Sequence, residues 1–338
     1  MLINDDNKKS EEYAEIYQVA HMYYDLNMLQ SDIADKLFLS RPKVSRLLNQ
    51  AKELGIVEIK VHPVIDRLPS LEKKLCDLFG LQDAIVISSH PDRLENMEEA
   101  LIKYSSQYVG QKIKKGGIIG ISKSRTVNAI LDQLKLDDQY PLEIVQQMGT
   151  TVNSLSMQDT TLILTRLAQH HSNLTFHALS TSLYVNDLYL KEVILREPAV
   201  HAVFEKMTRC TLMLTGLSAP EKRSNVHNSW QGLMNAHHIE EHTDLKAAGC
   251  MLAQYYNING IKLPSEWNAK VIAMNLNSLS VIPTRIGVAQ GLDKIRPIYG
   301  GLKGKLLNVI ITDSNTASDV ISLADKRNAA KAARDGLK

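Results

Sequence analysis

Short apolar runs rich in β-branched residues alternate with stretches of helical periodicity over most of this chain. The runs that read as strands are AIVIS (84–88), IIGIS (118–122), LEIVQQM (142–148), LTFHAL (174–179), CTLMLTGL (210–217), KVIAM (270–274), RIGVA (285–289) and NVIITD (308–313). Helical spacing of apolar residues occupies 92–114, 126–136, 155–171 and 315–337. Strands joined through helices must run parallel and need both sheet faces covered. The pattern predicts an α/β domain with a mostly parallel sheet and helices on both faces.

A different pattern occupies residues 29–55, LQSDIADKLFLSRPKVSRLLNQAKELG, and predicts a helix-turn-helix. Ser31 is placed to cap a first helix, and Ser40 is a good N-cap for a second helix. Pro42 suits the first turn of that second helix, where a missing N–H costs nothing. Gly55 ends it as a residue just beyond a helix often does.

The second helix presents basic and amide side chains opposite its apolar positions, which fits the major groove of DNA. The residues predicted to contact DNA are Gln30, Ser31, Ser40, Arg41, Lys43, Ser45, Arg46 and Gln50. The alternation in IVEIKV (56–61) predicts a short wing strand. The alternative interpretation is an amphipathic helical hairpin with a charged, solvated face.

The domain organisation expected is a winged helix-turn-helix at 1–62 and a larger effector and oligomerisation domain at 63–338. Residues 1–62 hold eight Lys or Arg and ten Asp or Glu, so the positive charge of the first domain is local. Its first helix is expected at Glu11–Asp25, after a frayed segment 1–10. Beyond the boundary, Leu68, Leu71, Leu75 and Leu78 form a helical seam, which is either core or a self-association surface.

Composition excludes several classes of protein. The three cysteines, Cys76, Cys210 and Cys250, are widely spaced and show no CxxC pattern, which indicates buried free thiols in a reducing cytoplasm. The N-terminus lacks the apolar region of a signal peptide, and no apolar run is long enough to span a membrane. A net charge of +2 indicates no partner by itself. We expect a cytoplasmic protein without a membrane partner.

The stretch GGIIGISKSRTVNAIL is the best candidate for a ligand site, because a strand is followed directly by a polar helix start. Ligands of open α/β sheets bind at the carboxyl ends of strands, where helix N-termini and cationic side chains favour anions. Plain helix capping is the alternative. The loops MGTTVN (148–153) and GVAQGLDK (287–294) follow other strands in the same way, so three loops together predict a pocket for a small phosphorylated molecule.

The string His238-Ile239-Glu240-Glu241-His242 matches the HxxEH spacing of some zinc peptidases. Five residues of common types match such a pattern often by chance, and the alternative is a polar, surface-exposed helix. We expect no metal site and no cofactor.

The chain resembles the SorC family of sugar-binding transcriptional regulators from about Glu12 to about Leu323. SDIADKLFLSRPKVSRLLNQAKELGIVEIKV looks like the family's N-terminal domain, IGISKSRTV is similar to its phosphate loop, and IVQQMGT is similar to the strand and loop that follow. GVAQGLDKIRPIYGGLKGKLLNVIITDSNTASDVI is similar to its C-terminal signature. The resemblance implies a Rossmann-like sensor domain related to phosphosugar isomerases and deaminases, a homodimer or homotetramer, and operator DNA near carbohydrate operons.

The effector-binding residues that the resemblance and the loops together predict are Ser122, Lys123, Ser124, Arg125, Thr126, Gly149, Thr150, Thr151, Cys250, Gln290 and Lys294. Three of them depart from the family pattern. Ser124 and Gln290 stand where the family usually has Gly, and Cys250 replaces an acidic residue.

Three functions are compatible with these features. The first is a transcription factor controlled by a phosphorylated sugar or sugar alcohol. The second is a phosphosugar isomerase or deaminase with an appended DNA-binding domain, which is disfavoured because GTTVNSLS offers no general base before Asp159. The third is a DNA-binding scaffold that has lost its ligand.

Overall fold

A computed structural model describes residues 3–57, 67–88, 97–136, 139–151, 160–220 and 233–335. The chain divides into two compact units, Met1–Val64 and Ile65–Lys338, within two residues of the expected boundary. Most of the predicted wing strand and the first residues of the helices predicted at 92–114 and 155–171 lie outside the described residues.

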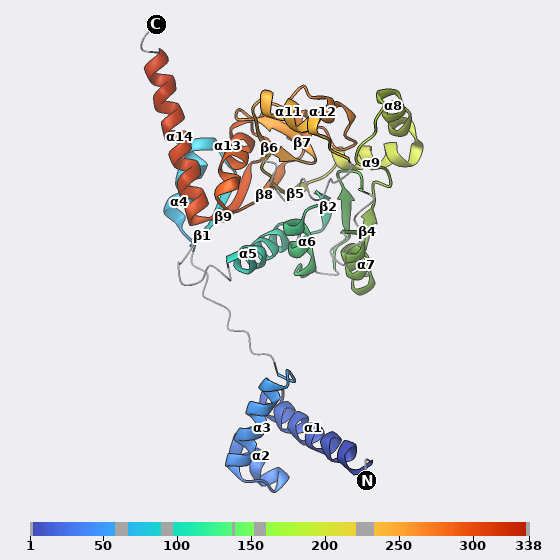
Figure 1. Ribbon diagram of the computed structural model, residues 1–338, viewed down its shortest axis with the longest axis vertical. Coiled ribbons are helices and arrows are strands. Elements are labelled where there is room, and N and C mark those ends of the chain that lie inside the picture. Colours follow the sequence, from blue (N-terminus) through green and yellow to red (C-terminus); the bar gives the residue numbers. More distant parts are fainter. Residues whose placement is uncertain are drawn as a thin grey trace. The chain divides into compact units, whose positions relative to one another are not determined.

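The first unit contains three described helices, α1 (Ile3–Tyr24), α2 (Gln30–Leu37) and α3 (Arg41–Glu53) (Figure 1). They enclose a small core of Ile16, Val19, Ala20, Met22, Ile33, Ala34, Val44, Leu47, Leu48 and Ala51. The helical spacing of these apolar residues is what makes each helix bury one face. Because α1 begins at Ile3, the expectation that residues 3–10 are frayed is wrong.

The caps of α3 agree with the sequence, whereas the cap of α2 does not. Ser40 Oγ accepts a hydrogen bond from Lys43 N, and Gly55 follows α3 with a φ of +69°. The α2 helix begins two residues earlier than a Ser31 cap implies, with Leu29 as an N-cap that offers no side-chain bond. Ser31 lies inside the helix, where its hydroxyl donates to Asp32, so its prediction as a cap is wrong.

The second unit is built on a seven-stranded sheet with the order β1-β9-β8-β5-β2-β3-β4, in which every neighbouring pair is parallel. The strands are β1 (Asp83–Ile87), β2 (Gly117–Ile121), β3 (Leu142–Gln146), β4 (Leu174–His177), β5 (Leu212–Gly216), β8 (Thr284–Val288) and β9 (Val309–Asp313). This confirms the predicted α/β class and the mostly parallel sheet.

Helices cover both faces of this sheet, as the alternation in the sequence predicts (Figure 1). The larger helices are α4 (Pro69–Phe79), α5 (Met97–Lys112), α6 (Arg125–Asp132), α7 (Thr160–His170), α8 (Leu188–Arg196), α9 (Pro198–Thr208), α11 (Ala236–Asp244), α13 (Ile295–Lys303) and α14 (Ser314–Asp335). Along β1, Ile85 and Ile87 join the core under α5, α6 and α7, while Ala84 and Val86 join the core under α4, α13 and α14. Alternate residues of each strand therefore serve different cores.

The run KVIAM (270–274) is not a strand, and this prediction is wrong. Val271 and Ala273 make only isolated bridges, to Tyr184 and Met148, and a short helix α12 (Glu266–Lys270) precedes them. An antiparallel hairpin of β6 (Ala247–Met251) and β7 (Gln254–Asn257) precedes this segment of the chain. The 3-10 helix η2 (Leu276–Val281) follows the segment, and the 3-10 helix η3 (Leu292–Lys294) follows β8.

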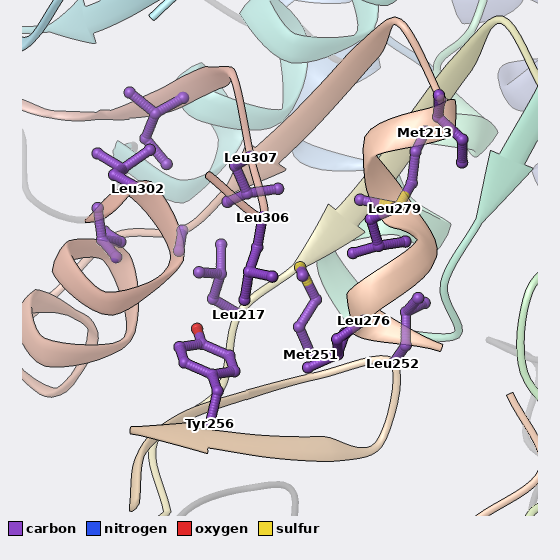
Figure 2. Close-up of a cluster of buried hydrophobic side chains, with 14 of the residues drawn as sticks. Met213, Leu217, Met251, Leu252, Tyr256, Leu276, Leu279, Leu302, Leu306 and Leu307 are labelled. Atoms are coloured by element: carbon purple, nitrogen blue, oxygen red, sulfur yellow. The ribbon is translucent and has the colours of Figure 1, made fainter. Parts of the chain in front are cut away.

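The leucine seam of α4 is core. Leu75 is buried, and Leu68, Leu71 and Leu78 pack against the same cluster of side chains. Figure 2 shows part of that cluster, where side chains of the β6–β7 hairpin, β5 and α13 meet side chains of η2 and of residues 306–307. The labelled side chains are Met213, Leu217, Met251, Leu252, Tyr256, Leu276, Leu279, Leu302, Leu306 and Leu307. The core alternative for the seam is therefore the correct one.

Candidate effector site and nucleic-acid interface

The strand order of the sheet reverses between β2 and β5. From β2 the chain adds β3 and β4 on one side, and then returns to place β5 and β8 on the other. Loops that leave two such strands in opposite directions separate at their carboxyl ends and leave a crevice, where open α/β sheets bind ligands. The crevice expected here is bounded by Ser122 after β2 and Leu217 after β5.

A cavity of about 160 Å³ lies at this place. It is lined by Ser122, Lys123, Ser124, Arg125, Thr126, Met148, Gly216, Leu217, Ser218, Cys250, Met251, Leu252, Ala253 and Lys294. An engineered cavity of about 150 Å³ takes up one benzene molecule, so this volume suits a small metabolite. The structure therefore brings together all five predicted residues of the β2 loop, and with them Cys250 and Lys294.

The start of α6 gives the cavity its polar wall. Ser124 is the N-cap of α6, and its Oγ accepts a hydrogen bond from Val127 N at 3.1 Å. Gly216 lies so close that an added Cβ would be 2.9 Å from Ser124 Oγ. The glycine that ends β5 therefore lets this strand end and the start of α6 approach each other across the point where the strand order reverses.

Lys294 reaches the cavity from a turn that is itself anchored. Gly291 adopts a φ of +105°, and its N–H donates to Thr316 Oγ1 at 2.8 Å. Thr316 is held by Asp313, whose carboxylate also accepts from the Thr316 N–H at 3.0 Å. The Lys294 ammonium pairs with Asp293 at 2.5 Å, and the Lys294 side chain as a whole is 22% exposed. An ammonium held beside the start of α6 adds positive charge to the same wall.

Cys250 lies on the opposite wall, in the β6–β7 hairpin. Its backbone is bridged to Ser218, since each N–H donates to the other residue's carbonyl, at 2.9 and 3.0 Å. Burial raises the pKa of the Cys250 thiol well above its ordinary value, so the side chain is a neutral thiol. Leu252 and Ala253, which follow Met251 at the end of β6, have positive φ values of 50° and 58° and form the turn of the hairpin.

Four of the predicted effector residues are not among the residues that line the cavity: Gly149, Thr150, Thr151 and Gln290. The loop after β3 is held elsewhere, because Gly149 N donates to Ile272 O and Thr150 N donates to Thr181 O. Among the described residues of this loop, 148–151, only Met148 lines the cavity. A role for these four residues in effector binding stays a prediction.

Sequence reasoning missed the lining residues Gly216, Leu217 and Ser218, although a signal was present. Gly216 and Leu217 end the predicted strand CTLMLTGL and Ser218 follows it, and the carboxyl end of this strand faces the same crevice as that of IIGIS. It also missed Leu252 and Ala253, for which no signal existed, because two-residue hairpin turns of this type usually carry Asn or Gly.

In the first unit, the face of α3 opposite the core is exposed at Arg41, Ser45 and Arg46. Gln30, Ser31 and Ser40 lie near the helix starts, and Gln50 is half-buried. Lys43 is different, since its ammonium forms an ion pair with Glu15 of α1 at 2.7 Å. The first turn of α3 contains no acidic residue. These positions are compatible with a cationic face for DNA, in which Arg41 and Arg46 are exposed and Lys43 is half-buried.

The HxxEH string forms α11, but its two histidines are buried and not surface-exposed, so that alternative is wrong for them. His238 packs edge-on against the stacked rings of Tyr184 and Trp267, and its Nδ1 accepts from Asn235 N. His242 stacks on Tyr255 with 3.8 Å between ring centroids. Among the described residues, no group of three or more His, Cys, Asp or Glu is placed to hold a metal ion.

The thiols are free among the described residues, as predicted, with Cys210 and Cys250 buried and Cys76 half-buried. None of the described helices combines the length and the hydrophobicity that a membrane span requires.

Comparison with known proteins covers nearly the whole chain. The family model described as "Putative sugar-binding domain" matches residues 65–322. The sorbitol operon regulator of Klebsiella pneumoniae is 26% identical over 314 residues, which cover 92% of this chain and 98% of that protein. The deoxyribonucleoside regulator of Bacillus subtilis (strain 168) is 27% identical over 311 residues, which cover 90% of this chain and 96% of that protein.

The fold agrees with these relationships. The crystal structure of the full-length sorbitol operon regulator SorC from Klebsiella pneumoniae aligns with a TM-score of 0.67 and 24% identity over 90% of this chain and 98% of that one. The family match spans most of the second unit, and the relatives align along both units. The chain therefore belongs to the SorC family of sugar-binding transcriptional regulators.

Proposed function

We propose that this protein is a DNA-binding transcriptional regulator of a carbohydrate-utilisation operon, controlled by a phosphorylated sugar or sugar alcohol. The observation that carries the proposal is the cavity at the point where the strand order reverses, in the same chain as a three-helix unit with exposed arginines on α3. A regulator of this kind acts on DNA in the cytoplasm.

The chemistry of one wall supports a phosphate group. Lys123, Arg125 and Lys294 supply positive charge, and Ser122 and Thr126 supply hydroxyl groups. The N-terminal N–H groups of α6 add a partial positive charge that favours an anion. A phosphate ester that enters this corner meets charge-assisted hydrogen bonds from several directions.

The opposite wall supports a small, partly apolar remainder. Met148, Leu217, Met251 and Cys250 present carbon and sulfur atoms to the cavity. The C–H face of a short sugar or sugar alcohol can pack against such a surface, while the volume of about 160 Å³ disfavours an oligosaccharide.

A sensor is favoured over an enzyme by the same set of residues. Isomerisation or deamination of a phosphosugar needs a positioned general base, normally a carboxylate or a histidine. Neither type occurs among the described residues that line the cavity, and the buried Cys250 thiol is neutral. The proposed mechanism also uses no cofactor and no metal.

Regulation requires that the ligand bind one arrangement of the protein more tightly than another, since a ligand with equal affinity for both shifts nothing. We extend the proposal to a homodimer or homotetramer, because operators read by helix-turn-helix proteins usually consist of paired half-sites. Sedimentation equilibrium of the full chain tests this part, and a monomer at micromolar concentration would contradict it.

The experiment that tests the function begins with selection of duplexes from a random pool by the full chain. Fluorescence anisotropy then measures the Kd of the selected duplex during titration with sugar phosphates, each paired with its unphosphorylated sugar. We expect at least one phosphorylated compound to change the Kd by fivefold or more, a typical allosteric coupling, while its unphosphorylated partner has no effect. Selection without a motif would refute DNA recognition, and turnover of a sugar phosphate would favour the enzyme.

A further inference from the structure

The turn between α2 and α3 carries an aromatic side chain that the fold does not use. Phe38 has a φ of +56° and a ψ of +39°, in the left-handed region. Its side chain is 95% exposed, more than any other large hydrophobic side chain in the described part of the chain. A bulky residue in this backbone region is a genuine outlier. Because the ring is exposed, packing in the core does not explain why a phenylalanine stands here.

The backbone, in contrast, needs this conformation. The N–H of Leu39 donates to Ala34 O at 2.8 Å, and Leu39 itself packs against the core of the unit. This closes α2 in the manner of helices that end with a left-handed residue, for which glycine is the usual choice. The same chain places Gly55 at this position after α3 and Gly80 after α4, with φ values of +69° and +66°. Asn27, Lys246 and Lys305 also adopt positive φ values just after helices, and Phe38 differs from them in carrying an exposed aromatic ring.

The fold requires the left-handed conformation at residue 38 but makes no use of the phenylalanine ring, and a bulky side chain kept at such a position marks a candidate functional residue. Phe38 precedes the N-cap Ser40 by two residues, and the exposed cations Lys36 and Arg41 lie on either side of it in the sequence. The start of a recognition helix is the part that reaches base edges, and a phenylalanine there makes apolar contact with the thymine methyl group.

We propose that Phe38 is a specificity-determining residue that contacts a thymine methyl group in each half-site of the operator. The inference rests on the proposed DNA-binding function and adds a reader of base sequence to Arg41 and Arg46. In this interpretation Phe38 lowers the stability of the first unit and is retained because it recognises DNA. One substitution should therefore raise the stability of this unit and weaken its binding to DNA.

The test uses the full chain with Phe38→Gly. Hydrogen exchange of the peptides that cover α2 and α3 should slow by about fivefold or more, because glycine adopts the left-handed conformation without steric cost. Selection from random duplexes should lose the preference for thymine at one position of each half-site while the rest of the motif remains. Affinity for the wild-type motif should fall by roughly fivefold or more, since a good base contact is worth that much discrimination.

Two controls make the result specific. Replacing the thymine by uracil removes only the methyl group. This replacement should lower the affinity of the wild-type chain by the same factor as the Phe38→Gly substitution does, and it should leave the affinity of the Phe38→Gly variant unchanged. Leu54→Ala removes an exposed apolar side chain at the far end of α3 and should leave the motif unchanged.

The inference is overturned if Phe38→Gly selects the same motif with the same affinity, if affinity falls equally for all duplexes, or if sedimentation shows a changed oligomeric state instead. These outcomes differ from failure of the proposed function, in which the wild-type chain itself selects no motif.

Discussion

The substitution Gly216→Ala tests whether the polar wall of the cavity depends on the close approach of the β2 and β5 loops. The added Cβ would lie 2.9 Å from Ser124 Oγ, so the hydroxyl must move. That hydroxyl caps α6 through a 3.1 Å bond from Val127 N, and loss of an N-cap costs about 1 kcal/mol. We therefore expect Gly216→Ala to destabilise the second unit by about 1 kcal/mol, which corresponds to a fall in Tm of roughly 2–4 °C.

A double-mutant cycle isolates the cause. Ser124→Ala removes the cap without crowding and should also cost about 1 kcal/mol. In the double variant the cap is already absent, and the Cβ of residue 124 lies 3.3 Å from the added Cβ, a contact that a small shift relieves. The double variant should therefore cost about 1 kcal/mol, whereas independent effects would sum to about 2 kcal/mol.

Urea unfolding of the full chain measures these free energies, and Gly301→Ala is the matched control. The nearest atom to a Cβ at Gly301 is 3.4 Å away, so this helical glycine should accept alanine with no loss of stability. Additive costs in the cycle, or a Gly216→Ala variant as stable as wild type, would refute the reasoning about the loops.

Three further predictions concern other parts of the chain. Cys210 should resist a thiol reagent at pH 8 in the folded chain, because burial raises its pKa to about 12; rapid labelling there, mapped by mass spectrometry, would contradict this. The Lys206 ammonium lowers the pKa of Glu143, so this ion pair stabilises the fold above pH 4.5 and the contribution is lost as the pH falls through the lowered pKa. Glu143→Gln should therefore reduce stability to urea at pH 7 more than at pH 3, and equal reductions would oppose this assignment. Arg46→Ala should weaken binding to the selected duplex by roughly fivefold or more, and by a larger factor than Lys43→Ala, because Lys43 is already engaged in an ion pair; the reverse ranking in anisotropy titrations would count against the assigned face.

The parts of the fold that follow from local chemistry could be predicted from the sequence. The α3 caps at Ser40 and Gly55 rest on hydrogen bonds within one turn, and the parallel strands rest on apolar runs that only a doubly covered sheet can bury. KVIAM was misassigned because an apolar run of that length is equally compatible with a buried loop, which here bridges to Met148 and Tyr184.

The candidate site was predictable where it lies at a strand end and not where it depends on tertiary approach. Ser122–Thr126 and Lys294 follow strands, so the α/β topology places them at one edge. Leu252 and Ala253 reach the cavity because the hairpin is bridged through Cys250 to Ser218, which no local pattern indicates. The burial of His238 and His242 likewise depends on Trp267 and Tyr255, which are distant in the sequence.

The most direct test of the account blocks the cavity without touching the first unit. Ser218→Trp keeps the backbone bonds to Cys250 and places a large side chain at the cavity wall. With the duplex selected by the wild-type chain, the Kd is measured by anisotropy at increasing concentrations of the sugar phosphate that shifts the wild-type value. The account predicts that Ser218→Trp binds the duplex with the wild-type Kd and no longer responds to the sugar phosphate. An undiminished response in this variant would show that the effector binds elsewhere and would contradict the central claim.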